Sequence, residues 1–154
     1  MRSLVVLAVL VLTGCGAAHD RAKPVDWRSG ADAACFKARS LLAPLAPPSN
    51  FRTAELVAGA VALALRQELD RTAALGTPPA SAARAAERLR RARRAMLVEL
   101  VGEIRAARRH DLRGIQRAIR RLTPLSHAAT TAAAAAGLRI CGHELDRGLT
   151  EQPA

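Results

Sequence analysis

The sequence is poor in aromatic residues: it holds two Phe, one Trp and no Tyr among 154 residues, although half of the chain is hydrophobic. The apolar content is therefore mostly Ala, Leu, Val and Ile, which suits closely packed helices. Runs of β-branched and aromatic residues with alternating polarity, which would predict strands, are absent. These absences favour an all-α protein, and the length favours a single domain with a modest core.

Motifs that carry chemistry are also missing. The four histidines have none of the spacings of metal-binding motifs, and no Glu-x-x-His unit of a di-iron bundle occurs. No serine lies in a GxSxG context, and no glycine-rich phosphate loop is found. We therefore expect no metal site, no cofactor and no catalytic residue, and an enzyme is the least supported class. The histidines are His19, His110, His127 and His143.

Two acids, Glu99 and Glu103, are one helical turn apart in the sequence. Such a pair can act as general acid and base, but residues at this spacing more commonly neutralise neighbouring arginines on a helix surface. We favour the second interpretation.

The apolar run at the N-terminus, Leu4 to Leu12, is shorter than the roughly 20 residues that a membrane-spanning helix needs. It follows Arg2 and precedes Leu12-Thr13-Gly14-Cys15, a layout typical of a secretory signal peptide. The last four residues resemble the bacterial lipobox, in which the cysteine receives a diacylglyceryl group and the bond before it is cut. The sequence thus predicts a signal peptide over residues 1–14 and a lipid anchor at Cys15. The alternative is a signal peptide that is followed by a chance cysteine.

Export and lipidation would make this an extracytoplasmic lipoprotein of the cell envelope, anchored to the cell membrane. Residues 15–29 contain Pro24 and no apolar period, so we interpret them as a tether after the lipidated cysteine. Trp27 in this tether is either a contact with the folded domain, which we favour, or a ring at the membrane interface. The helical domain is expected over residues 30–142, and a polar tail over 143–154.

Apolar residues at helical spacing predict four helices, over residues 31–43, 52–75, 78–109 and 112–136. Ser29 with Asp32 three residues later fits a capping box for the first helix, and Thr77 and Asp111 are the expected caps of the third and fourth. Leu112 begins the apolar side of the fourth helix.

Pro124 removes a backbone donor within the fourth helix, so a kink or a split is expected near Thr123. Gly137 is the expected left-handed stop, with Leu138 folding back. Because the connections are short, we expect an up-and-down antiparallel helical bundle of one short and three long helices, the fourth kinked near Pro124.

Two cysteines remain besides Cys15. Cys35 lies in the first predicted helix and Cys141 follows the last one, 106 residues later. Export would place both in an oxidising compartment, where a remaining pair favours a disulfide bond over two free buried thiols.

Several segments resemble a group of small helical lipoproteins of high-GC Actinobacteria. They are Ala31-Asp32-Ala33-Ala34-Cys35, Leu41-Leu42-Ala43-Pro44, Leu75-Gly76-Thr77-Pro78-Pro79, His110-Asp111-Leu112 and Ala136-Gly137-Leu138-Arg139-Ile140-Cys141. The resemblance covers residues 31–141 and implies an all-helical extracytoplasmic domain whose ends are tied by a cysteine pair. It implies no activity. The sequence departs from the group in having His110 where a glycine is common.

The charge is uneven. The chain has 24 Lys and Arg residues and 13 acidic residues. The segment from Ser81 to Arg121 contains thirteen arginines and four acids. Two groups stand out on adjacent predicted helices: Arg84, Arg88 and Arg91 on one, and Arg113, Arg117, Arg120 and Arg121 on the other. Anionic lipids, wall polymers or an acidic envelope protein are the expected partners, whereas export and the lack of stacking aromatics speak against nucleic acid. The alternative is a solvated arginine face.

The sequence therefore favours a membrane-anchored, non-enzymatic helical module that has a binding or a structural role. One rival is an adaptor bundle whose functional surface is an apolar groove for another helix. A second rival is an envelope sensor or carrier that binds a small apolar ligand in the bundle core.

Overall fold

The computed structural model describes residues 26–142, and these form four α-helices without a strand. The helices are α1 (Trp27–Leu42), α2 (Phe51–Ala74), α3 (Ala80–Arg108) and α4 (Leu112–Ala135). The all-α prediction is thereby confirmed. The predicted signal peptide, Cys15 and the polar tail lie outside the described residues.

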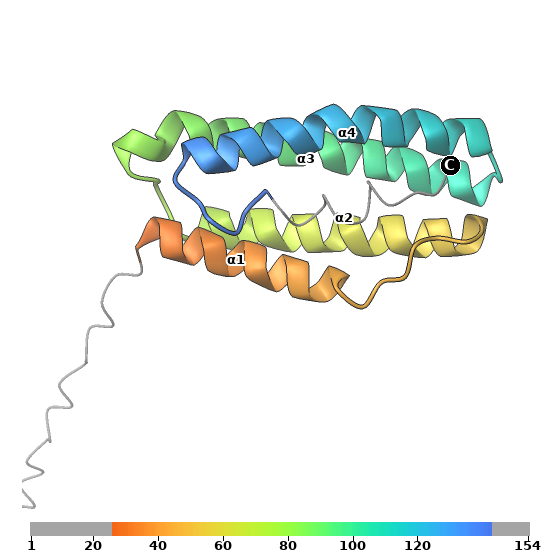
Figure 1. Cartoon of the computed structure of the whole chain (residues 1–154), viewed down its shortest axis with the longest axis horizontal. Coiled ribbons are helices and arrows are strands. Elements are labelled where there is room, and N and C mark those ends of the chain that lie inside the picture. Colours follow the sequence, from red (N-terminus) through yellow and green to blue (C-terminus); the bar gives the residue numbers. More distant parts are fainter. Residues whose placement is uncertain (1–25, 143–154) are drawn as a thin grey trace, which may run out of the picture.

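The helices lie along a common direction, α1 beside α2 and α3 beside α4 (Figure 1). α1 and α3 begin at one end of the molecule, and α2 and α4 begin at the other. α3 packs against both α2 and α4, so it links the two halves. After α4, residues 137–142 turn back between α4 and α1.

Small side chains make most of the core. A large cluster of buried residues includes Cys35, Leu65, Met96 and Leu122 together with many alanines, and Trp27 packs against it while partly exposed. A smaller cluster holds Ala54, Ala106, Ala107 and Ile115. Because alanine leaves the helix backbone close to its neighbour, a core with few aromatic residues can still pack densely.

The start of α1 differs from the prediction. Asp26 is the N-cap, and its carboxylate accepts a hydrogen bond from the Ser29 backbone N–H at 3.2 Å. The proposed Ser29–Asp32 capping box is therefore wrong, and Trp27 belongs to the helix and not to a tether. The earlier start has two physical reasons: Asp26 is itself a good cap, and the added turn brings Trp27 against the core.

The N-caps of the other three helices agree with the sequence predictions only in part. The Asn50 side chain and Thr53 form a capping box at α2 that was not predicted. α3 starts after Pro79 without any side-chain cap, so Thr77 is not its cap; a residue before proline avoids the helical region, which keeps Thr77 and Pro78 outside the helix. Asp111 caps α4 as predicted, accepting from the Gly114 N–H at 2.9 Å.

The end of α4 also follows the prediction. Gly137 has φ +77°, and the Leu138 N–H donates back to the Ala133 carbonyl at 3.0 Å. Pro124 lies inside α4, which continues through it as one element, so the helix does not split there; the kink stays a prediction. Leu112 is 57% exposed, contrary to its expected place on the apolar side, since it occupies the first residue of the helix.

Candidate functional site

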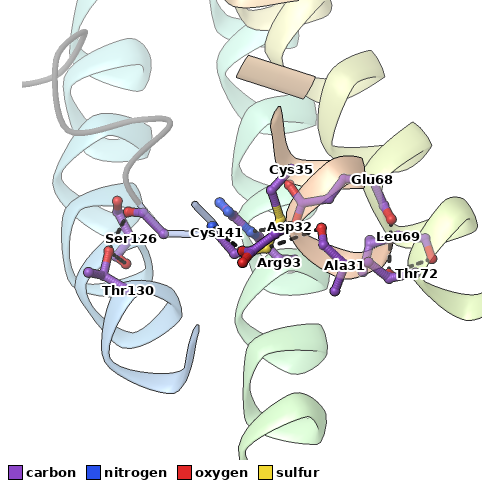
Figure 2. Close-up of polar contacts among 11 residues, drawn as sticks. Ala31, Asp32, Cys35, Glu68, Leu69, Thr72, Arg93, Ser126, Thr130 and Cys141 are labelled. Atoms are coloured by element: carbon purple, nitrogen blue, oxygen red, sulfur yellow. Dashed lines mark hydrogen bonds and ion pairs between the residues drawn. A yellow bond between two sulfur atoms is a disulfide. The ribbon is translucent and has the colours of Figure 1, made fainter. Parts of the chain in front are cut away.

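A disulfide joins Cys35 on α1 to Cys141 in the segment after α4, with 5.2 Å between the two Cα atoms. Both residues are buried in the main core. The predicted pairing is confirmed, and the alternative of two free thiols is wrong. The bond ties the start of the helical domain to its end (Figure 2).

Asp32 strengthens the same junction. Its carboxylate accepts backbone N–H groups of the segment after α4: Ile140 at 2.9 Å, Arg139 at 3.0 Å and Cys141 at 3.4 Å. A carboxylate that accepts several N–H groups forms charge-assisted hydrogen bonds with them. Sequence reasoning missed this role, and the only local signal was that Asp32 stands three residues before a cysteine with a distant partner.

Further hydrogen bonds join the same parts of the chain. The Arg28 guanidinium donates to the Ala136 carbonyl and to the Ser81 hydroxyl, both at 3.0 Å. The Thr130 hydroxyl donates to the Gly142 carbonyl at 2.6 Å. The beginnings of α1 and α3 and the end of α4 are thus held together at one end of the molecule.

A buried ion pair links α2 to α3. Arg93 Nε lies 3.1 Å from Glu68 Oε1, and the two side chains are 2% and 3% exposed. In the sequence, Arg93 was counted only among the thirteen arginines between Ser81 and Arg121, and the pair was not predicted. The signal was present, because Arg93 falls on the same helical stripe as the buried Leu89, Met96 and Leu100.

A cavity of about 20 Å³ lies beside this pair, between α1, α2 and α3. Its lining includes Trp27, Glu68, Thr72 and Arg93. A space of this size accommodates roughly one water molecule.

Glu99 and Glu103 lie in different surroundings. Glu99 Oε2 lies 3.6 Å from Arg121 Nη1 on α4, as expected for an acid that neutralises an arginine. Glu103 is buried instead, and desolvation raises the pKa of its carboxyl from 4.5 to about 7. The expectation that Glu103 neutralises a surface arginine is therefore not met.

The histidines show no clustering within the described residues, which contain no group of three or more potential metal ligands. His110 has φ +55°, the backbone conformation that favours glycine, and its ring stacks on Phe51 with 5.0 Å between the centroids. The stacking gives His110 a structural role in the turn between α3 and α4. His127 is exposed, and His19 and His143 lie outside the described residues.

All seven arginines singled out from the sequence are exposed. However, the α3 group and the α4 group lie toward opposite ends of the helical hairpin, because α3 and α4 run in opposite directions (Figure 1). Arg121 lies beside Glu99, which follows Arg91 by eight residues, or about 12 Å along α3. Arg117 approaches Asp111 at 3.4 Å. The structure thus does not join the seven into one patch.

Within the part of the chain that the structure describes, no helix is long and apolar enough to cross a membrane. Comparisons of the chain with protein-family models, with curated proteins and with solved structures find no match.

Proposed function

We propose that this chain is a membrane-anchored extracytoplasmic lipoprotein whose folded part is a non-enzymatic up-and-down helical bundle, kinked near Pro124, that contacts anionic envelope material. The observation that carries the proposal is the exposure of many arginines along α3 and α4. Few acids offset them: Glu103 is buried and Glu99 is engaged by Arg121. A basic surface of this kind attracts anionic headgroups or phosphate-bearing polymers.

Two further observations support the extracytoplasmic location. The Cys35–Cys141 disulfide is a bond that persists in oxidising compartments and is rare in reducing ones. The lipobox-like residues before Cys15 follow a short apolar run. The resemblance to small helical lipoproteins agrees with both observations and stays part of the proposal.

The small-ligand alternative has less support, because the cavity beside Glu68 and Arg93 is about 20 Å³ and a drug-sized ligand requires several hundred. The adaptor alternative requires an apolar groove. The exposed apolar side chains are distributed over several elements, for example Phe36 on α1, Leu56 on α2 and Val98 on α3. The basic surface is therefore the better candidate.

Mass spectrometry of the protein isolated from bacterial envelopes tests the anchor. The expected N-terminal residue is Cys15 carrying a diacylglyceryl thioether. The Cys15→Ser variant should stay unprocessed or leave the membrane fraction. An unmodified Cys15 thiol in the wild-type protein would contradict the anchoring proposal.

Vesicle binding tests the basic surface. A form that starts at residue 16 is mixed with vesicles of phosphatidylcholine alone or with added phosphatidylglycerol, across a salt series. Binding should require the anionic lipid and weaken as salt rises, because screening shortens the electrostatic range to about 8 Å at physiological ionic strength. Binding that ignores lipid charge and salt would reject the electrostatic proposal. Binding that survives when Arg88, Arg91, Arg117 and Arg121 all become Gln would show that these four arginines are not the contact.

A further inference from the structure

One face of α3 is exposed along most of the helix and carries only basic and apolar side chains over its central part. We call it the outer α3 stripe: Arg91, Arg94, Val98, Val101 and Arg105. Their spacing alternates between three and four residues, which places them on one side of the helix. Val98 is 69% exposed and Val101 is 41% exposed, so neither valine is used by the core.

No acid of α3 lies among the residues of the stripe, and Glu87 is one turn before its first member, Arg91. Glu87 pairs with Arg90 at 2.7 Å, and Glu99 approaches Arg121 on α4. Glu103 is 9% exposed and is enclosed by the bundle. Arg94 and Arg105 therefore keep their charge uncompensated by the acids of their own helix, whereas Arg91 has Glu87 one turn before it.

The combination of exposed arginines and exposed valines on the outer α3 stripe favours one kind of binding partner over another. A second copy of the chain would bring the same arginines against each other, which charge repulsion opposes. An anionic bilayer surface complements both components: the arginines meet the headgroups, and the valines between them enter the boundary between headgroups and acyl chains. Long arginine side chains reach headgroups even when neighbouring apolar groups lie deeper.

We propose that the outer α3 stripe is the surface by which this protein lies on an anionic lipid bilayer. The inference rests on the proposed membrane anchoring and goes beyond it by assigning the contact to Val98, Val101 and the arginines around them. Of the seven arginines chosen from the sequence, which lie toward opposite ends of the hairpin, it keeps only Arg91.

The anchor geometry is compatible with this orientation. The bond from Arg28 to Ser81 places the start of α1 beside the start of α3. The eleven residue-to-residue steps from Cys15 to Asp26 span at most about 36–40 Å when extended. Arg105 lies 24 residues beyond Ser81, or about 36 Å along the helix. Because the anchor only has to reach from Asp26 to the bilayer, a tether of this length does not prevent α3 from lying along the surface.

Fluorescence quenching by brominated lipid tests the assignment in the full chain, reconstituted into vesicles with phosphatidylglycerol or with phosphatidylcholine alone. The Trp27→Phe variant removes the native signal, and Val98→Trp adds a probe on the stripe. The matched control is Gln116→Trp, which places the same probe at an exposed position of α4. In anionic vesicles brominated chains should quench about half of the emission from position 98 and little from position 116.

The quenching at position 98 should fall at high salt. It should also fall when Arg94→Gln and Arg105→Gln are added to the Val98→Trp variant. It should persist when Arg94→Lys and Arg105→Lys are added instead, because lysine keeps the charge. Equal quenching at both positions, or stronger quenching at position 116, overturns the assignment of the stripe. If that quenching still depends on salt and lipid charge, electrostatic docking stands without the stripe. Quenching that is independent of both overturns docking as well. An unquenched position 98, as under a partner helix or a second copy, also overturns the proposal.

Discussion

Asp32 on α1 accepts a hydrogen bond from the backbone N–H of Ile140, 108 residues further along the chain, at 2.9 Å. The same carboxylate accepts from Arg139 and Cys141. The side chain therefore fixes the direction in which residues 139–141 leave α4, next to the disulfide (Figure 2).

Asp32→Ala should lower the free energy of unfolding by about 1–3 kcal/mol, because it removes the acceptor of partly buried N–H groups. Amide hydrogen exchange should speed up at Arg139, Ile140 and Cys141 more than in α2. Urea denaturation measures the free energy of unfolding, and mass spectrometry measures the amide exchange. Asp70→Ala, at an exposed position of α2, is the matched control. Equal effects of the two substitutions would show that the Asp32 carboxylate has no special role.

Reducing the disulfide should lower the melting temperature, because the bond closes a loop with a sequence separation of 106 residues. On the chain-entropy model such a loop contributes about 4–5 kcal/mol. Calorimetry with and without reductant measures the change. The Cys35→Ala/Cys141→Ala variant should melt at a lower temperature and show no response to reductant. A wild-type melting temperature that reductant leaves unchanged would contradict the prediction.

The buried Glu68–Arg93 pair should be sensitive to the loss of one partner. Glu68→Leu or Arg93→Met alone should destabilise the protein by about 3–5 kcal/mol, because the other charge is left in the core. The Glu68→Leu/Arg93→Met double variant should recover much of this loss, since two apolar side chains of similar size leave no buried charge. Chemical denaturation of the single and double variants completes the cycle. Additive losses would indicate that the two groups do not interact.

Glu103 should make stability depend on pH. Its folded-state pKa of about 7 lies above the ordinary value of 4.5, so the folded protein holds the proton more tightly than the unfolded chain. This contribution to stability is present below pH 4.5, declines as the pH rises from 4.5 to 7, and stays lost above that. Glu103→Met should therefore raise stability at pH 8, by about 1–3 kcal/mol, with a smaller gain at pH 4.

Denaturation of Glu103→Met across pH 4 to 8 measures this effect, and Glu87→Gln on the surface of α3 is the control. A gain that is the same at both ends of the range would place the titration elsewhere in the protein.

The sequence by itself determined the helical class, the approximate position of each helix, the Asp111 cap, the Gly137 stop and the cysteine pair. These features depend on spacing and residue type within one or two helical turns, or on there being two cysteines besides Cys15. The N-termini of α1 and α3 were less accurate, because Asp26 and Pro79 compete with Ser29 and Thr77 at positions only a few residues apart.

Only the tertiary structure decided which partner each buried polar residue meets and which surfaces are continuous. Arg93 is buried opposite Glu68, which faces it from α2. Glu103 is buried because it lies on the side of α3 that faces the other helices. Asp32 binds the chain end because residues 137–142 return between α4 and α1. The seven chosen arginines separate because adjacent helices run in opposite directions. Each outcome depends on what lies opposite a residue on another helix, and residue spacing along one helix carries no record of that partner.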